Sequence, residues 1–338
     1  MQANIFRIHS VPLPDGGLNT IISFHGCPLR CSWCSRTAPA KPTSILWDDK
    51  NCLYCGLCEQ LCPTGAIRFQ KGNGKGNFSF DASKCCLCLA CVNNCPTRRL
   101  GFAEEMIDSE EIIAAIRSHA VEYQRGGEIS FQNVNTDNQV LFTVEVLKKC
   151  REMNLRTSVY TTGFLHSLPF TTLARWADSV SIDLKHYDEK KHIQYTGVST
   201  HTILANLDAA VMMDQLYEVR ISIIKGVNDT LFDAKQFGTL LTEHGVRNVC
   251  LVDFVMMNTH QFTLENAASE RAIHASASFQ DGESKPNDSD FTAAHIRLLR
   301  YAAFLRGYGL NVRVATPLPN RETKCTEELK ITPRREHA

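Results

Sequence analysis

Cysteines crowd one part of this chain: twelve of its fifteen lie between Cys27 and Cys95. In a small secreted domain such a density would indicate a disulfide framework, but this chain has 338 residues, 43% of them hydrophobic, enough to build a large core without disulfides. Residues 1–15 also lack the basic start and continuous apolar stretch of a signal peptide. We therefore expect a cytoplasmic protein whose reduced thiols are gathered to bind metal. The other three cysteines are scattered and are interpreted as buried or incidental thiols: Cys150, Cys250 and Cys325.

The charge balance argues against two classes of partner. Lysine plus arginine equals aspartate plus glutamate, at 36 each, so the chain as a whole carries no field that would attract nucleic acid or an anionic membrane surface. No apolar run approaches the roughly 20 residues that a membrane-spanning helix needs. We expect neither nucleic acid nor membrane as a partner.

Helix-like and strand-like segments alternate over most of the chain, which predicts an α/β fold with a parallel sheet and right-handed crossovers. We infer a partial (βα)6 barrel, related to the TIM barrel, with its site at the carboxyl ends of the strands. The expected strands are residues 20–25, 128–131, 157–160, 179–182, 218–223, 249–254 and 311–314. The expected helices are residues 109–119, 141–153, 170–176, 231–244 and 292–307, and residues 267–290 are expected to form a long loop.

From about Trp47 to Leu100 the sequence changes character and contains the spacing C-x2-C-x2-C-x3-C-P twice. This is the pattern of two-cluster bacterial ferredoxins, in which the fourth cysteine of each run binds the other cluster. That pattern implies one 4Fe-4S cluster on Cys52, Cys55, Cys58 and Cys95 and another on Cys85, Cys88, Cys91 and Cys62, with Cys86 left over. Paired C-x2-C units also suit zinc, but two complete runs that both end in Cys-Pro favour iron and sulfur.

A third group, Cys27, Cys31 and Cys34, follows the first expected strand and supplies only three ligands. A cubane cluster held by three thiolates keeps one iron open for another ligand. A chance trio or a zinc site is the alternative, but the position after a strand and beside a ferredoxin-like insert favours the cluster.

This C-x3-C-x2-C loop resembles that of the radical S-adenosylmethionine (SAM) superfamily. Within it the chain resembles the activating enzymes of glycyl radical enzymes, of the larger kind that has two additional clusters. The resemblance runs nearly end to end and rests on residues 26–34 (GCPLRCSWC), 183–186 (DLKH), 195–199 (YTGVS) and 226–229 (GVND).

The resemblance implies three 4Fe-4S clusters and SAM as cofactors. In the family the methionine amino and carboxylate groups bind the open iron, and an electron breaks a sulfur–carbon bond to give a 5'-deoxyadenosyl radical. The radical then removes hydrogen from a backbone glycine of a partner glycyl radical enzyme. Reduced flavodoxin or ferredoxin is the implied electron donor, and no protein residue is implied as catalytic beyond cluster and SAM.

The implied organisation is a radical SAM barrel interrupted by the insert. Residues 1–46 begin the barrel and carry the site cluster, residues 47–101 form the ferredoxin-like module, residues 102–330 complete the barrel, and residues 331–338 form a disordered tail.

By position, the resemblance implies SAM contacts at Trp33, Cys34, Ser35, Asp183, Leu184, Lys185, His186 and Arg220. Trp33 could equally be core, His186 a turn residue, and Arg220 half of an internal salt bridge. A charge at an inward-facing strand position is nevertheless best explained by pairing with the carboxylate of the cofactor.

The chain departs from the family where a Gly-Gly-Glu motif grips the methionine amino group. A gapless alignment places Asn133-Val134-Asn135 there, so the Val134 carbonyl and the Asn135 side chain are the expected contacts. Tyr160 stands where the family has an acid, and Val255 where it often has a histidine. These changes leave two alternatives: a radical SAM enzyme acting on another peptide or small molecule, and an iron–sulfur electron-transfer or binding relative that has lost SAM cleavage.

Overall fold

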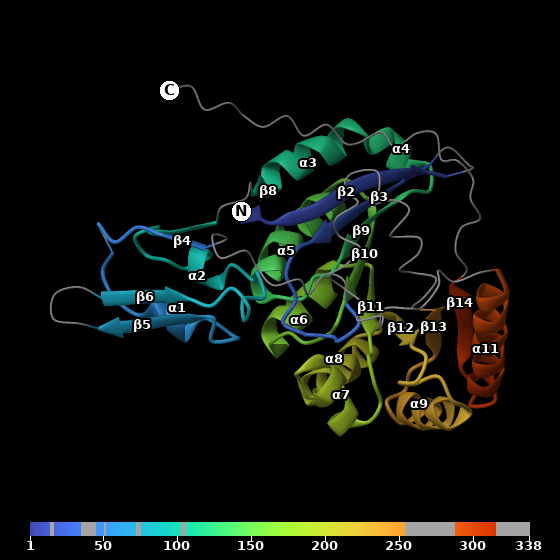
Figure 1. Ribbon diagram of the computed structural model, residues 1–338. Helices are drawn as coiled ribbons and strands as arrows, with labels where there is room; N and C mark the ends of the chain where they lie inside the picture. Colours follow the sequence, from blue (N-terminus) through green and yellow to red (C-terminus); the bar gives the residue numbers. More distant parts are fainter. Residues whose placement is uncertain are drawn as a thin grey trace. The chain divides into compact units, whose positions relative to one another are not determined.

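The computed structural model describes residues 1–13, 17–34, 45–50, 52–71, 76–102, 106–253 and 288–315 (Figure 1). These residues form two compact units. The N-terminal unit contains the described residues up to 29 and from 45 to 157, and the C-terminal unit contains residues 30–34 and the described residues from 158 onward. Of the expected features, Ser35, Val255, Cys325, the tail 331–338 and the loop up to residue 287 lie outside the described residues.

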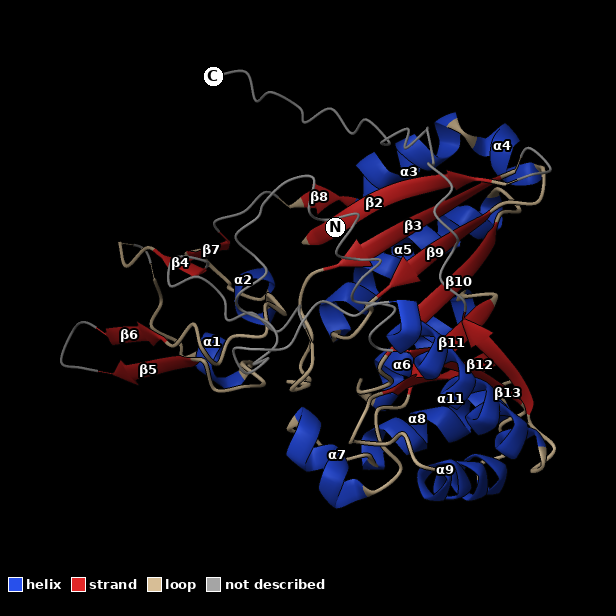
Figure 2. Ribbon diagram, turned by 45° about the vertical axis from the view of Figure 1, so that its right-hand side comes forward, coloured by secondary structure: helices blue, strands red, loops and turns tan. Residues whose placement is uncertain are grey.

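The N-terminal unit is built on three strands that run side by side in Figure 2: β2 (Ile5–Pro12), β3 (Leu18–Phe24) and β9 (Glu128–Gln132). β3 pairs antiparallel with β2 and parallel with β9. β3 is rich in β-branched and aromatic residues, and it buries Ile22 and Phe24. The Phe24 ring meets the Phe142 ring edge-on at 5.7 Å, which joins the strand to α5.

Short elements and three helices complete this part of the unit. They are β1 (Gln2–Ala3), β8 (Ile107–Asp108), α3 (Ser109–Ser118), α4 (Ala120–Gln124) and α5 (Asp137–Glu152). β1 pairs with β8, and α3 packs against α5. The Asp108 side chain accepts the Glu110 amide and so caps the start of α3.

The insert is made of two antiparallel strand pairs and two short helices. Its elements are β4 (Ile45–Trp47), α1 (Leu57–Gln60), β5 (Ile67–Lys71), β6 (Gly76–Phe80), α2 (Ala90–Asn93) and β7 (Leu100–Phe102). β4 pairs with β7 and so joins the two ends of the module, and β5 pairs with β6. Its small core holds Ile45, Ile67, Leu89, Cys91 and Leu100.

The C-terminal unit alternates strand and helix. Its elements are β10 (Arg156–Thr161), α6 (Ser167–Trp176), β11 (Ser179–Asp183), α7 (Glu189–Thr196), α8 (His201–Met212), β12 (Leu216–Ile223), α9 (Leu231–Glu243), β13 (Asn248–Asp253), α11 (Asp288–Arg306) and β14 (Asn311–Ala315). β10 to β14 pair in chain order and all in parallel. α11 lies along β14 and packs on α9 (Figure 1).

Parallel strands alternating with helices confirm the α/β class, and the module of β4 to β7 interrupts this alternation. The seven expected strands correspond to β3, β9, β10, β11, β12, β13 and β14, and each of them takes part in a parallel pair. The expectation omitted β2, α7 and α8. α7 buries only His192 and Thr196, both polar, so it carries no apolar period. α8 does carry that signal, since Ile203, Leu207 and Ala210 are buried at helical spacing.

No helix among the described residues has both the length and the apolar character needed to cross a membrane.

Candidate functional site

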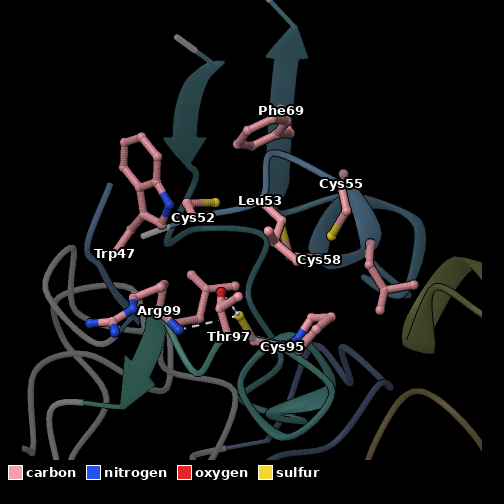
Figure 3. A pocket seen from close by; sticks show the side chains of 13 residues that line it. Trp47, Cys52, Leu53, Cys55, Cys58, Phe69, Cys95, Thr97 and Arg99 are labelled. Carbon is pink, nitrogen blue, oxygen red and sulfur yellow. Dashed lines mark hydrogen bonds between the residues drawn. The ribbon is translucent and has the colours of Figure 1, made fainter. Parts of the chain in front are cut away.

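One pocket of the insert is lined by cysteines from both runs. Cys52, Cys55, Cys58 and Cys95 surround the same space, with Trp47 and Phe69 on its wall (Figure 3). The first three thiols come from the loop before and within α1, and the fourth comes from the end of the second run. The grouping is the exchanged set that the ferredoxin pattern implies.

A second pocket is lined by the complementary set: Cys62, Cys85, Cys88 and Cys91. Ile45, Ile67 and Phe80 contribute apolar wall, and Cys86 also lines this pocket. Among the described residues, no three histidine, cysteine or acidic side chains converge as ligands of a single metal ion.

The two cysteine runs share one backbone conformation. Left-handed φ values occur two residues after the first cysteine, at Tyr54 (50°) and Leu87 (53°), and two residues further on, at Gly56 (74°) and Leu89 (56°). Apart from glycine, few residues adopt this region without a compensating interaction. Its recurrence in both runs shows that each loop is shaped in the same way to point its thiols inward.

Backbone amides are directed at the first and fourth thiol of each run. The Cys52 sulfur accepts the Tyr54 amide at 3.4 Å and the Cys85 sulfur accepts the Leu87 amide at 3.4 Å. The fourth cysteines follow the same rule, since Ala66 donates to Cys62 at 3.2 Å and Arg99 to Cys95 at 3.3 Å. Amide donors stabilise the thiolate form that metal ligation requires, so the donor set fits a 4Fe-4S cluster in each pocket.

Burial and amide contacts act in opposite directions on these thiols. Burial raises the pKa of Cys91 to about 12. Burial also works to raise the pKa of Cys95, but the amides of Arg99 and Leu100 outweigh it and leave that pKa below the ordinary value. A deeply buried thiol such as Cys91 becomes a thiolate only when a metal compensates its charge.

Cys27, the first cysteine of the C-x3-C-x2-C loop, lies in the N-terminal unit directly after β3. Its amide donates to the Cys86 carbonyl of the insert at 3.2 Å. Gly26 has φ +91°, and a Cβ there would stand 2.5 Å from the Leu87 carbonyl oxygen and 2.8 Å from that of Cys86. Only glycine therefore lets the loop approach the insert this closely.

The other two cysteines of the loop, Cys31 and Cys34, belong to the C-terminal unit. The flanking amides of Arg30 and Ser32 donate to the carbonyls of Thr196 (2.7 Å) and Tyr195 (3.0 Å), the last two residues of α7. Burial raises the pKa of Cys31 to about 11.

Trp33 packs on Tyr195 with ring centroids 5.6 Å apart, and it remains half-buried. The YTGVS segment, which helped to define the resemblance, thus supports the cysteine loop.

Charged side chains meet at the carboxyl ends of β11 and β12. Lys185 Nζ lies 2.9 Å from Asp183 Oδ2, and Asp183 stands beside Arg220 in the strand register. Burial works to raise the pKa of Asp183, but Lys185 and Arg220 outweigh it and lower that pKa. Burial likewise works to lower the pKa of Lys185, but Asp183 holds it above the ordinary lysine value. Both groups are therefore charged at neutral pH.

Arg220 lies over the Tyr160 ring, with its guanidinium carbon 5.1 Å from the ring centroid. Its Nε is buried and has no hydrogen-bond partner among the described residues. A buried guanidinium N–H without an acceptor is suited to an incoming carboxylate. Asp183 forms its ion pair with Lys185, and the nearby Arg220 charge also lowers the pKa of this carboxyl group.

Leu184 and His186 are both fully buried. The Leu184 amide donates to the Arg220 carbonyl at 3.0 Å, which ties β11 to β12. His186 Nδ1 accepts the Asp188 amide at 2.9 Å, as a turn residue would, while its Nε2 is buried without a partner among the described residues. Burial lowers the pKa of His186, so the ring is neutral.

Val134 and Asn135, the expected replacements for the family's Gly-Gly-Glu, lie in the N-terminal unit just before α5, with 0% and 3% of their surfaces exposed. Asn133 before them has φ +61°, and its Nδ2 is buried without a partner among the described residues. The Asn135 amide donates to Gln139 Oε1 at 2.8 Å.

Sequence reasoning missed three residues that support the site: Tyr195, Asn138 and Gln139. Tyr195 stood inside the YTGVS segment, so the resemblance pointed to it without giving it a role. Asn138 donates to the Cys88 carbonyl at 3.1 Å, and Gln139 donates to the His25 carbonyl at 2.5 Å. The Thr136-x-x-Gln139 capping pattern predicts a helix start there, but nothing in it predicts the contacts to distant segments.

Comparison with known proteins supports these groupings. A family model described as a 4Fe-4S dicluster domain matches residues 51–99, which are the two cysteine runs. The choline trimethylamine-lyase activating enzyme of Oleidesulfovibrio alaskensis is 29% identical over 237 residues, which cover 69% of this chain and 76% of that protein. The (2S)-3-sulfopropanediol sulfolyase activating enzyme of Bilophila wadsworthia is 30% identical over 234 residues, which cover 67% and 76%.

Among solved structures, a radical SAM methyltransferase from Sphaerobacter thermophilus superposes with a TM-score of 0.50 at 13% identity, covering 90% of this chain and 68% of that chain. This likeness concerns the fold alone. The family is identified by the relative from B. wadsworthia, which is 30% identical over two thirds of this chain, together with the dicluster module and the cysteine loop. The chain belongs to the family of glycyl radical enzyme activating enzymes.

Proposed function

We propose that this chain is a radical SAM activase that acts on a partner glycyl radical enzyme. SAM and a 4Fe-4S cluster, when bound, supply the one-electron chemistry that removes a hydrogen atom from a backbone glycine of the partner. Cys27, Cys31 and Cys34 would hold the cluster at which SAM binds. The two insert pockets would hold the other two clusters, which makes three in total.

The observation that supports this proposal best is the charge arrangement at the ends of β11 and β12. Asp183, Lys185 and Arg220 gather in the unit that also holds Cys31 and Cys34. An amino acid group presents an ammonium and a carboxylate, and this set offers a charge of each sign. The Arg220 Nε, buried without a partner among the described residues, is the donor assigned to the SAM carboxylate.

The chain's own residues orient the reactants and exclude water. Trp33, held against Tyr195, offers an aromatic face for the adenine, and Cys34 and Ser35 are assigned to the same end of the cofactor. Leu184 and His186 are assigned as packing contacts at the strand end. No side chain is required to move a proton, since a hydrogen atom is what is transferred; orientation and water exclusion are the contributions left to the protein.

The insert is assigned to receive electrons from a reduced flavodoxin or ferredoxin. Thiols, aromatic rings, aliphatic side chains and two threonines line its pockets, and among the described lining residues Arg99 alone is charged. Such a lining suits electron transfer.

A second candidate is an iron–sulfur electron-transfer relative that has lost SAM cleavage. The region at Asn133-Val134-Asn135 favours it, because it lacks the family's carboxylate and because Val134 and Asn135 are buried. A radical SAM enzyme with another peptide or small molecule as substrate remains a variant of the first proposal.

The test is anaerobic reconstitution followed by an iron count and a cleavage assay. We expect about twelve irons per chain, since three 4Fe-4S clusters are proposed. Dithionite and SAM should then yield methionine and 5'-deoxyadenosine. Cys27→Ala should abolish cleavage and remove about four irons, whereas Cys250→Ala, a buried cysteine outside the loop, should retain both.

Full iron without cleavage by the wild-type protein would overturn the activase and favour the second candidate. Cleavage without a glycyl signal in electron paramagnetic resonance (EPR), when a co-expressed glycyl radical enzyme is added, would indicate another substrate.

A further inference from the structure

Gln139 bonds to two other segments from the first turn of α5. Its Oε1 accepts the amides of Asn135 (2.8 Å) and Thr136 (3.0 Å), which completes a capping box with Thr136. Its Nε2 donates to the carbonyls of His25 (2.5 Å) and Gly26 (3.3 Å), the two residues before Cys27. The side chain is 5% exposed. One amide group therefore both starts a helix and holds the backbone of the cysteine loop.

The neighbouring residue reaches the insert. Asn138 Nδ2 donates to the Cys88 carbonyl at 3.1 Å, and Cys88 is an expected ligand in the second pocket. Adjacent residues of one helix start thus hold the backbone at Gly26 and at Cys88, which are 62 positions apart in the sequence.

Between these two anchored segments lies a direct contact. The Cys27 amide donates to the Cys86 carbonyl at 3.2 Å, and Gly26 lies so close to the carbonyls of Cys86 and Leu87 that a Cβ would collide with them. Of the two insert runs, it is the second that makes this contact among the described residues. Cys52, Cys55 and Cys58 of the first run line the other pocket.

We propose that the electron enters the Cys27 loop through the Cys86 carbonyl and the Cys27 amide, and that Gln139 and Asn138 are positioning residues that keep this junction closed. The proposal rests on the proposed function, because it needs clusters on both sides. The route runs from the Cys85 sulfur through the backbone to the Cys86 carbonyl, across one hydrogen bond, and through Cys27 to its sulfur.

The step transfers one electron and no proton. The group held by Cys62, Cys85, Cys88 and Cys91 is oxidised by one electron, the group held by Cys27, Cys31 and Cys34 is reduced by one electron, and no bond forms or breaks. The pocket of Cys52, Cys55, Cys58 and Cys95 is then the more distant relay. The order of electron flow follows from which run contacts the loop.

Gln139→Glu separates the junction from the helix cap. A carboxylate still accepts the amides of Asn135 and Thr136, and a negative charge is favourable at a helix N-terminus. It cannot donate to the carbonyls of His25 and Gly26. The variant should therefore fold with α5 in place while its hold on the loop is lost.

Asn138→Asp removes the donor to Cys88 in the same way. Its matched control is Asn94→Asp. Asn94 Nδ2 also donates to a backbone carbonyl, that of Ala90, at 2.9 Å. This contact lies within the insert and at an exposed position. Both changes add one negative charge near the cysteine runs. Only Asn138→Asp breaks a contact between α5 and the insert.

The measurement is the rate at which the site-cluster EPR signal appears in freeze-quenched samples after mixing with reduced ferredoxin. Gln139→Glu and Asn138→Asp should keep the wild-type iron content and slow this rate severalfold, because electron-transfer rates fall steeply as the contact across the junction lengthens. Spin–spin broadening between the fully reduced clusters should fall in the same variants. Asn94→Asp should match the wild type in rate and broadening.

The two hypotheses fail differently. Unchanged rate and broadening in both variants at full iron content would overturn the junction, whatever the cleavage activity. Absence of SAM cleavage in the wild-type protein would overturn the proposed function, while the transfer rate between clusters would still report on the junction. If Gln139→Glu loses iron, Asn138→Asp decides alone.

Discussion

The insert and the ends of β11 and β12 assemble their functional groups in different ways. In the insert, eight cysteines come from two runs of eleven residues, and the same backbone turns recur in both. At the strand ends, Asp183 and Lys185 meet Arg220 from the next strand, 35 positions further along the chain than Lys185. The first arrangement depends on local loops, and the second depends on strand register.

This difference teaches what each region tolerates. We expect a cysteine one position out of the pattern, such as Cys86, to be no cluster ligand, because the repeated loop conformation directs the other thiols inward. A charge at a strand end depends on its neighbours, so its removal leaves a partner uncompensated without dismantling the fold. The predictions below are ordered by expected effect and are aimed at this contrast.

The largest effect should come from adjacent cysteines of the second run. Cys85→Ala removes an expected ligand and should remove about four irons per chain. Cys86→Ala removes a thiol that lines the same pocket but has no place in the repeated pattern, and it should keep all the iron. Iron and sulfide analysis after reconstitution distinguishes them. Equal losses in both variants would break the claim that local spacing decides ligation.

At the strand ends, Arg220→Met should weaken SAM binding. The lost charge-assisted hydrogen bond is worth about 1.5–3 kcal/mol, which corresponds to roughly a 10- to 150-fold higher dissociation constant. Arg313→Met is the matched control, because Arg313 is bound to Glu218 at 2.7 Å and should affect stability alone. Equilibrium binding of SAM to the reconstituted proteins measures both. Equal affinities for SAM would remove Arg220 from the cofactor site.

The close approach of the cysteine loop to the insert can be tested with two glycines of positive φ. Gly26→Ala adds a collision with the Leu87 carbonyl, whereas Gly56→Ala meets no atom within 4 Å. Both should pay about 1–2 kcal/mol for the left-handed conformation, and Gly26→Ala should lose about 1–3 kcal/mol more. Denaturant unfolding under anaerobic conditions gives the difference. If Gly56→Ala were as unstable as Gly26→Ala, the close contact between Gly26 and the insert would contribute nothing to the free energy of unfolding.

The smallest effect should be a pH dependence of the C-terminal unit through His192. Burial lowers the pKa of His192, although the Val198 carbonyl, 2.7 Å from Nδ1, works to raise it. The unfolded chain then binds the proton more readily than the folded one, so stability should fall as the pH drops below about 6.5. We expect a loss of about 1 kcal/mol between pH 7.5 and pH 5.5.

His192→Asn should flatten this dependence, whereas His201→Asn, at an exposed position on α8, should keep the wild-type slope. Unfolding midpoints followed by tryptophan fluorescence at several pH values measure it. A slope unchanged in His192→Asn would assign the pH dependence to other groups.

The sequence by itself determined the cysteine groups and the alternation of elements. Cysteines at the spacing C-x2-C-x2-C are held close together by the short chain between them, so the sequence predicts which thiols share a pocket. The ferredoxin pattern also predicts the exchange of Cys62 and Cys95 between the two pockets. The strands have apolar patterns of their own, and all seven expected strands lie within a few residues of the observed bounds. The sequence did not predict α7, because its buried side chains are polar and give no apolar period.

Only the tertiary structure decided how distant segments meet. The contacts from Gln139 to His25, from Asn138 to Cys88 and from Cys27 to Cys86 join segments separated by 50 to 114 positions. The orphaned Arg220 Nε and the support of Trp33 by Tyr195 have the same origin. Side chains and carbonyls of this kind are common throughout a sequence, and only packing selects which pairs come within hydrogen-bond distance.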